Sequence, residues 1–206
     1  MSATMKRLLF PLGVTLSFLA CGDNHAPVVS PLRPDSAGLA AFETVREVLQ
    51  HPRCKNCHPG GDAPLQGDDG RVHAQNVHRG KDGRGNVGEE CTTCHGPANP
   101  PSAYGAHVPP GSEKGWHMPA EDTKLVFEGM TPRALCEQLK DPARNGGKDM
   151  AALRAHLDDP LVTWGWAPGF GRAPVPVPRD RFLAAWETWT RASAPCPSTE
   201  ALSRRD

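Results

Sequence analysis

The first regular pattern of hydrophobic positions in the chain lies just upstream of residue 52. Its apolar residues recur every three or four positions, the spacing that places them on one face of an α-helix: Leu39, Phe42, Val45, Val48 and Leu49. Asp35 or Ser36 can cap the start of this helix, and Pro52 ends it just before Cys54. We therefore expect an amphipathic helix that leads into the first cysteine motif, with its apolar stripe turned toward the group that this motif holds.

Three further helices are predicted in the last third of the chain. Thr131 and Pro132 begin the first of them with a capping residue and a proline at the first helical position, and Pro142 ends it. Asp149 can cap the second, and the third runs over about residues 180–194. Their apolar stripes are Leu135, Cys136 and Leu139, then Met150, Leu153 and Leu157, then Phe182, Trp186 and Trp189. A Trp- and Pro-rich connection, 160–178, separates the last two helices.

Residues 59–120 have neither a helical nor a strand period, and 20 of these 62 residues are Gly or Pro. So long an irregular run is unusual inside a compact domain unless it has a function. We therefore predict a fold that is mainly α with extensive irregular loops, in which something other than side chains supports the loops.

The N-terminus has the features of an export signal. Lys6 and Arg7 precede an apolar run of 13 residues, 8–20, which is too short to span a bilayer. We expect a signal peptide over 1–20, cleavage near Ala20, a Pro-rich tether over 21–34 and a periplasmic location. The stretch that ends in Cys21 resembles a bacterial lipobox, so Cys21 is a candidate for lipidation and for a membrane tether. An ordinary secretory signal is the alternative.

Composition narrows the possible functions. The 206 residues include 23 basic and 23 acidic side chains, so the chain lacks the basic excess of a nucleic-acid binder. Gly and Pro number 21 and 22, and only 6% of the residues are aromatic. A core made of side chains alone will be thin in a chain of this kind, which again indicates that another group fills part of the interior.

Seven cysteines account for most of the candidate chemistry. Four of them occur in two copies of one pattern, Cys54-x-x-Cys57-His58 and Cys91-x-x-Cys94-His95. Apart from Cys21, this leaves Cys136 and Cys196, and two spare thiols in an exported protein most simply form a disulfide. Such a bond would staple the first and last of the C-terminal helices.

Cys-x-x-Cys-His is the attachment pattern of c-type haem, in which the two thiols bond covalently to the haem and the histidine binds the iron. Zinc sites and redox dithiols also use Cys-x-x-Cys pairs, but neither explains a histidine directly after both pairs. We therefore predict two covalently bound haem c groups, with His58 and His95 as proximal iron ligands. Because these histidines are only 37 residues apart in sequence, we expect both haems within one fold and near each other.

The two motifs make the chain similar to small di-haem periplasmic cytochromes c, over roughly residues 38–120. A weaker similarity extends to haem-containing proteins labelled as isoquinoline-1-oxidoreductase subunits, on residues 76–83, Leu135-Cys136 and 145–147. Nothing in the chain resembles a molybdenum-cofactor domain. The resemblance implies a haem-wrapping region over 35–120, of the multihaem cytochrome c type, followed by a helical region over 121–206.

Haem used for electron transfer usually carries a second axial ligand. His73 and His117 are the preferred distal candidates, because both lie in the loop region and leave enough chain to reach around a porphyrin edge. His156 is a further candidate, Met118 is an alternative to His117, and His78 is a weaker one. We expect two histidines at each iron and, in the protein without its cofactor, a hollow lined by His58, His95 and the distal candidates.

Other charged side chains have two interpretations each. The arginines of the loop region can pair with haem propionates or lie on a solvated surface: Arg71, Arg79 and Arg84. The acidic pairs are expected to be solvated: Asp68-Asp69, Glu89-Glu90 and Asp158-Asp159.

The sequence lacks the usual hydrolase, metalloprotease and phosphate-binding motifs. It therefore favours an electron carrier between a periplasmic or membrane redox enzyme and the respiratory chain, without catalytic residues. Its partners would be redox proteins that act as electron donor and acceptor. The alternatives are a di-haem peroxidase-like enzyme and a haem-bearing docking subunit of a molybdenum hydroxylase.

Overall fold

A computed structural model describes residues 34–198 of the chain. These residues belong to one compact unit, Leu32–Asp206. The predicted signal peptide, Cys21 and the predicted tether up to residue 33 lie outside the described residues. Within the described part, no helix has both the length and the apolar character that crossing a bilayer requires.

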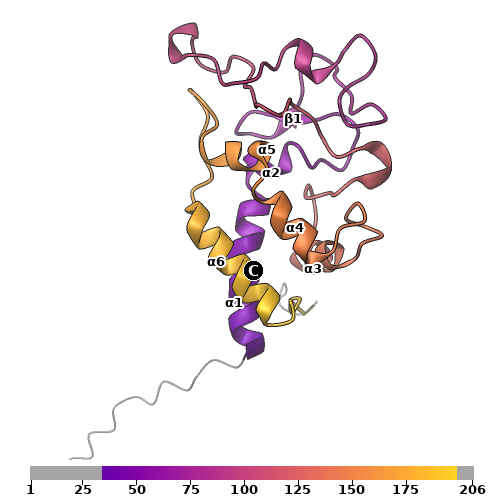
Figure 1. Ribbon diagram of the computed structural model, residues 1–206, viewed down its shortest axis with the longest axis vertical. Helices are drawn as coiled ribbons and strands as arrows, with labels where there is room; N and C mark the ends of the chain where they lie inside the picture. The colour runs from indigo at the N-terminus through magenta and orange to yellow at the C-terminus, as the bar shows by residue number, and fades with distance from the viewer. Residues whose placement is uncertain (1–33, 199–206) are drawn as a thin grey trace, which may run out of the picture. The chain divides into compact units, whose positions relative to one another are not determined.

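Helices and loops make up almost all of the described structure, as the sequence predicts (Figure 1). The helices are α1 (Pro34–Leu49), α2 (Pro52–Lys55), α3 (Pro132–Lys140), α4 (Met150–His156), α5 (Pro160–Thr163) and α6 (Arg179–Arg191). Two antiparallel strands of two residues each, β1 (Leu65–Gln66) and β2 (Arg71–Val72), form a hairpin. The loops between β2 and α3 contain only short 3₁₀ turns.

The core lies between α1 and α6, which pack against each other (Figure 1). The stripe predicted for α1 is buried, with Phe42 and Val45 fully inaccessible to solvent. Phe42 meets Trp189 of α6 with 5.1 Å between ring centroids, and Trp189 meets Trp186 edge-on at 5.3 Å. Gly38 permits the close approach, because a Cβ atom there would lie 2.7 Å from Pro195 Cγ. Both tryptophans of the apolar stripe predicted for this helix are thus buried.

The starts of α3 and α4 are where the capping residues predict them. The Thr131 hydroxyl accepts a hydrogen bond from the Ala134 amide at 3.2 Å, and Asp149 accepts one from the Ala152 amide at 2.7 Å. Each side chain thereby satisfies an amide that has no partner within its helix. The apolar faces of both helices join the core formed by α1 and α6, so the predicted regions 35–120 and 121–206 share one hydrophobic core.

Besides the hairpin of β1 and β2, two features differ from the sequence prediction. The segment predicted as a plain connection contains α5, and its N-cap is Asp159, whose carboxylate accepts a hydrogen bond from the Leu161 amide at 2.9 Å. Asp68 accepts a hydrogen bond from the buried Arg53 guanidinium and another, at 3.2 Å, from the Ala173 amide. Neither carboxylate is the purely solvated group that paired acidic residues suggested, because each satisfies a specific donor.

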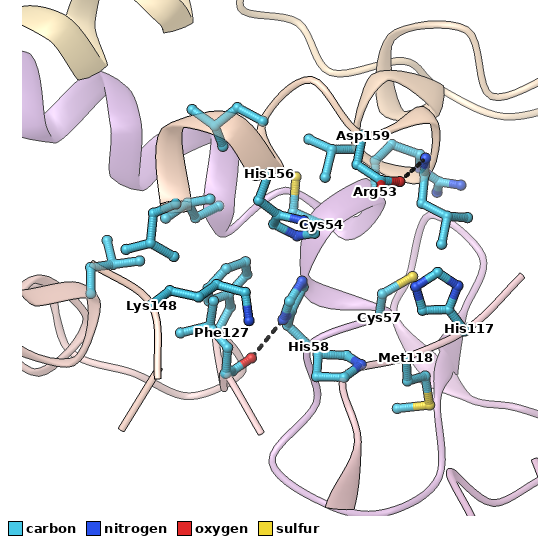
Figure 2. A pocket seen from close by; sticks show the side chains of 18 of the residues that line it. Arg53, Cys54, Cys57, His58, His117, Met118, Phe127, Lys148, His156 and Asp159 are labelled. Carbon is cyan, nitrogen blue, oxygen red and sulfur yellow. Dashed lines mark hydrogen bonds between the residues drawn. The ribbon is translucent and has the colours of Figure 1, made fainter. Parts of the chain in front are cut away.

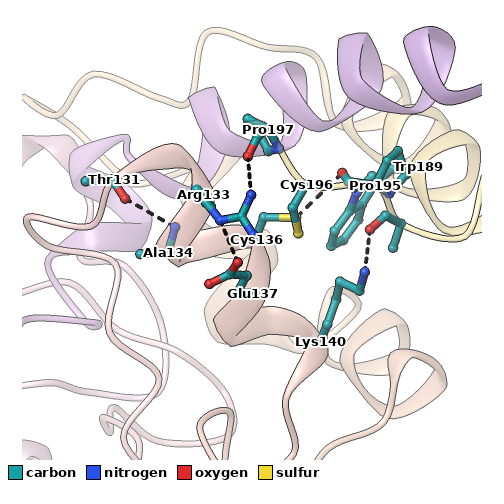
Figure 3. The surroundings of a disulfide bond; sticks show 11 residues. Thr131, Arg133, Ala134, Cys136, Glu137, Lys140, Trp189, Pro195, Cys196 and Pro197 are labelled. Carbon is teal, nitrogen blue, oxygen red and sulfur yellow. Dashed lines mark hydrogen bonds and ion pairs between the residues drawn. A yellow bond between two sulfur atoms is a disulfide. The ribbon is translucent and has the colours of Figure 1, made fainter. Parts of the chain in front are cut away.

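The disulfide between Cys136 and Cys196 is present, as predicted, and joins α3 to the segment that follows α6 (Figure 3). Two side chains of α3 reinforce this connection. Arg133 donates to the Pro197 carbonyl at 3.3 Å, and Lys140 donates to the Ala194 carbonyl at 2.8 Å. The C-terminal helices are therefore closed into a loop by one covalent bond and two side-chain contacts.

Replacing both cysteines with serine, as Cys136→Ser/Cys196→Ser, should lower the free energy of unfolding by about 4 kcal/mol, because the bond closes a loop of 60 residues in the unfolded chain. Urea denaturation of the oxidised protein and the variant measures this difference. The matched control is the unaltered protein under reducing conditions, which should unfold at the same urea concentration as the variant. Equal stability of the oxidised protein and the variant would contradict the prediction.

Candidate functional site

The first motif is held by one helical turn. His51 caps α2 by accepting a hydrogen bond from the Arg53 amide at its Nδ1 atom, 3.2 Å away. The Cys57 amide donates to the Cys54 carbonyl at 3.2 Å, and the His58 amide donates to that of Lys55 at 3.0 Å. Because residues three apart in a helical turn lie on the same side, the two thiols face one space.

That space is a cavity of about 430 Å³, within the ~300–1,000 Å³ range of ligand and cofactor sites. Cys54, Cys57 and His58 line it from α2 and the turn that follows, His117 lines it from a loop, and His156 lines it from α4 (Figure 2). Most of the remaining wall is apolar, including Val48, Leu49, Leu153, Leu157, Phe182 and Trp186. The last turn of α1 therefore faces the cavity, while the rest of its stripe packs in the core.

The His58 imidazole is held in one orientation. Its Nδ1 atom lies 2.6 Å from the Leu125 carbonyl oxygen, and its ring stacks on Phe127 with 4.1 Å between centroids. Desolvation lowers the pKa of His58 to about 3, so the ring is neutral at pH 7. A neutral ring whose Nδ1–H donates to a carbonyl has its lone pair on Nε2, the form that binds a metal.

The second motif repeats this arrangement with different partners. A 3₁₀ turn, Cys91–Thr93, carries it, and the His95 amide donates to the Cys91 carbonyl at 3.0 Å. The Nδ1 atom of His95 lies 2.8 Å from the Pro110 carbonyl oxygen. Its ring stacks on that of Trp116, with 4.7 Å between the ring centroids and 5° between the ring planes. Both motif histidines are therefore oriented by a backbone carbonyl and an aromatic face.

The two motifs differ in their exposure to solvent. Cys94 is exposed, and no residue of the second motif lines the 430 Å³ cavity. The prediction of one hollow lined by both motif histidines is therefore wrong, because His58 lines the cavity and His95 does not. The motifs are nevertheless neighbours, since the Cys91 thiol is close enough to Cys57 to contribute to raising its pKa.

His73 lies beside the second motif. The β1–β2 hairpin places it directly after β2, and its ring centroid is 6.4 Å from that of His95. Its Nδ1 atom is buried and makes no hydrogen bond within residues 34–198. Two imidazoles that bind one metal from opposite sides, each with its nitrogen about 2.0–2.1 Å away, have centroids roughly 6 Å apart. The observed spacing fits a metal between these rings.

Three distal candidates from the sequence gather at the first motif. The Nδ1 atom of His117 lies 3.1 Å from the Gly115 carbonyl oxygen. Because a carbonyl oxygen can only accept, Nδ1–H is the donor. Neither ring nitrogen of His156 makes a hydrogen bond in the described part of the chain, and His156 is near enough to His58 to help lower its pKa. The Met118 sulfur points away from His58 in Figure 2. His156 is therefore the candidate placed near His58, whereas His117 keeps its Nε2 lone pair free in the way that both motif histidines do.

The three arginines named from the sequence have different roles. Arg71 pairs with Asp69 on the surface, and Arg84 lines the cavity. Arg79 is buried and donates to the Pro119 carbonyl at 2.6 Å and to the Gly61 carbonyl at 3.0 Å. Arg79 therefore joins two loops, and of the three only Arg84 is in place to meet an anionic group in the cavity.

Several residues of the site carry no clear signal in the sequence. Lys148 adds a third cation to the cavity wall, beside Arg53 and Arg84, and Phe127 supplies the face on which His58 stacks. The carbonyls of Leu125 and Pro110 are backbone groups, which no residue pattern reveals. Arg53 alone offered a hint, because it directly precedes Cys54.

The structure disfavours both a redox dithiol and a zinc site at the cysteine pairs. Burial raises the pKa of the Cys54 thiol to about 12 and that of Cys57 to about 11, whereas redox dithiols need a lowered pKa. Within residues 34–198, no three His, Cys, Asp or Glu side chains gather as ligands for a bare metal ion. The four motif thiols are all free, which leaves them available for bonds to a cofactor.

Comparisons with protein-family models, with curated proteins and with solved structures give no match to this chain. The evidence for a function is therefore the site itself.

The buried clamp formed by Arg79 should contribute measurably to stability. Replacement by methionine, Arg79→Met, removes two charge-assisted hydrogen bonds and should lower the free energy of unfolding by about 2 kcal/mol or more. The control Arg71→Met removes only a surface ion pair and should change it by less than about 1 kcal/mol. Urea denaturation of both variants provides the test, and equal stabilities would show that Arg79 is not a clamp.

Proposed function

We propose that this protein is a di-haem c-type cytochrome that carries electrons between redox proteins. The observation that carries the proposal is the repeated geometry of two Cys-x-x-Cys-His motifs. In both, a backbone carbonyl accepts from Nδ1 of the histidine and leaves Nε2 free. Haem bound at each motif would supply one-electron chemistry through the ferrous and ferric states of its iron.

The residues fit this cofactor at the first motif. Cys54 and Cys57 present their thiols to an apolar cavity, and His58 presents a neutral imidazole to the same space. Arg84 and Lys148 line the cavity and can pair with the carboxylates of a haem. We assign the second axial position to His156, because it lies near His58. His117, whose Nδ1–H donates to the Gly115 carbonyl and leaves Nε2 free, is the alternative.

At the second motif, we assign His95 and His73 as the two axial ligands. The assignment is supported by the 6.4 Å between their ring centroids and by the unpartnered, buried Nδ1 atom of His73. Cys91 and Cys94 would hold the cofactor covalently. Coordination by two histidines favours a lower potential than coordination by histidine and methionine.

An electron carrier is favoured over a di-haem peroxidase by the ligand supply at the first site. A peroxidase needs one iron open to peroxide, whereas both His117 and His156 line the cavity beside His58. The proposed periplasmic location and the lipid on Cys21 stay predictions from the sequence. The donor and acceptor would be redox proteins, and a molybdenum hydroxylase that uses this chain as a haem-bearing subunit is one possible donor.

Removing the thiols of one motif should remove one haem and leave the other. We expect Cys54→Ser/Cys57→Ser and Cys91→Ser/Cys94→Ser each to retain half of the covalent haem of the unaltered protein, measured as the pyridine haemochrome of the denatured, exported chain. The control is Cys136→Ser/Cys196→Ser, which should retain all of it. Equal haem content in all three variants would contradict the proposal.

The proposed axial ligands predict a pattern of spin states. His73→Ala and His156→Ala should each convert one of the two ferric haems from low spin to high spin, because each removes a strong-field ligand. The control His78→Ala should leave both haems low-spin, and His117→Ala, which removes the alternative ligand, should leave them low-spin as well. Electron paramagnetic resonance measures the conversion, together with near-infrared magnetic circular dichroism.

A methionine–iron charge-transfer band in the unaltered protein would overturn the assignment of two histidines at each iron. Conversion by His117→Ala in place of His156→Ala would move the first distal ligand to His117. Rapid cyanide binding at one haem with peroxide turnover would favour the peroxidase.

A further inference from the structure

Besides the direct approach of Cys91 to Cys57, aromatic side chains from other parts of the chain link the two cysteine motifs. Trp116 lies parallel to the His95 ring, with 4.7 Å between centroids and 5° between planes. Trp116 in turn contacts Trp164, which begins a 3₁₀ turn after α5. Their ring centroids are 4.9 Å apart and their planes are at 88°. An edge-to-face contact at this distance is a favourable aromatic geometry. The rings therefore form a continuous stack that leads away from the second motif.

Arg53 extends this stack to the first motif. Its guanidinium carbon lies 5.7 Å from the centroid of the Trp164 ring, within the range of a cation–π contact. The Arg53 side chain is only 3% exposed and also donates to the Gly67 carbonyl at 2.9 Å. Because Arg53 directly precedes Cys54, packed side chains connect His95 to the backbone that carries the first motif.

Trp164 is fixed in this place by a dedicated hydrogen bond. Its indole N–H donates to Asn99 Oδ1 at 3.0 Å, and the amide nitrogen of Asn99 donates to the Ala167 carbonyl at 2.9 Å. Asn99 follows His95 by four residues, so it ties the second motif to the turn that carries Trp164. Since the indole has only this one donor, the bond sets the orientation of the ring.

We propose that Trp116 and Trp164 form a second electronic connection between the two haem sites, with Trp164 as its central residue. This inference rests on the proposed function. One electron leaves the ferrous iron of one site and enters the ferric iron of the other, and neither indole is oxidised. Tunnelling between the sites weakens steeply across gaps between atoms, and tightly packed rings leave no such gap.

The test uses the fully loaded protein and three variants. Trp164→Leu removes the middle ring, Trp164→Phe keeps a ring without the hydrogen bond to Asn99, and Phe170→Leu is the control. Phe170 is 57% exposed and belongs to the loop that follows the same turn. Pulse radiolysis with a one-electron radical donor gives the rate of exchange between the two haems. Pulsed electron paramagnetic resonance gives the spacing of the two ferric irons.

We expect a severalfold fall in the exchange rate for Trp164→Leu, a smaller fall for Trp164→Phe and none for Phe170→Leu, with iron spacing and both potentials unchanged. An unchanged rate in Trp164→Leu would overturn the inference. So would a rate that falls together with a changed iron spacing, because Trp164 would then act only as a spacer.

A second variant covers the case in which Trp164→Leu does not accumulate as loaded protein. Trp116→Leu is then measured in the same way, with the same expected fall at constant iron spacing. An unaltered protein that carries no haem would overturn the proposed function itself, and the pyridine haemochrome detects that failure before any rate is measured.

Discussion

The site depends on two backbone carbonyls that orient the motif histidines. A histidine ligand needs its Nδ1 proton placed on an acceptor, so that Nε2 carries the lone pair. Leu125 supplies that acceptor for His58, and Pro110 supplies it for His95. These carbonyls lie 67 and 15 residues from their histidines along the chain, so each imidazole can be oriented only after the chain has folded around it.

The rest of the fold positions these two carbonyls. The Gln138 side chain of α3 donates to the Val126 carbonyl at 2.6 Å and accepts from the Val126 amide at 3.3 Å. Gln50 donates to the Phe127 carbonyl at 2.7 Å. The segment that carries Leu125 is therefore anchored to α3 and to the chain just after α1. At the second motif the loops approach so closely that Gly111 is required, because a Cβ atom there would lie 2.4 Å from the Gly96 carbonyl oxygen. The disulfide, by fixing α3, also supports the first site.

The sequence predicted the parts of this arrangement that local rules govern. Helical periodicity located α1 and α6, and the capping side chains of Thr131 and Asp149 located the starts of α3 and α4. The motif histidines also follow from a local pattern, and the disulfide follows from the two cysteines that the motifs and Cys21 leave over. α5 was missed because a run of four residues has no readable period.

Contacts between distant loops could not be predicted in the same way. The position of His73 beside His95 depends on a hairpin of two-residue strands, for which alternation gives no signal. The burial of Arg79 and the contact of Trp164 with Trp116 depend on how irregular loops pack. That packing is set by three-dimensional neighbours, which one sequence does not display.

The central claim is that two haem groups are bonded to this chain through its four motif cysteines. The most direct measurement is the intact mass of the denatured, exported protein after extraction of any loosely held cofactor. The account predicts a mass higher than that of the processed polypeptide by two haem groups, with the added mass on the peptides that contain residues 54–58 and 91–95. A denatured chain at the mass of the bare polypeptide would contradict it.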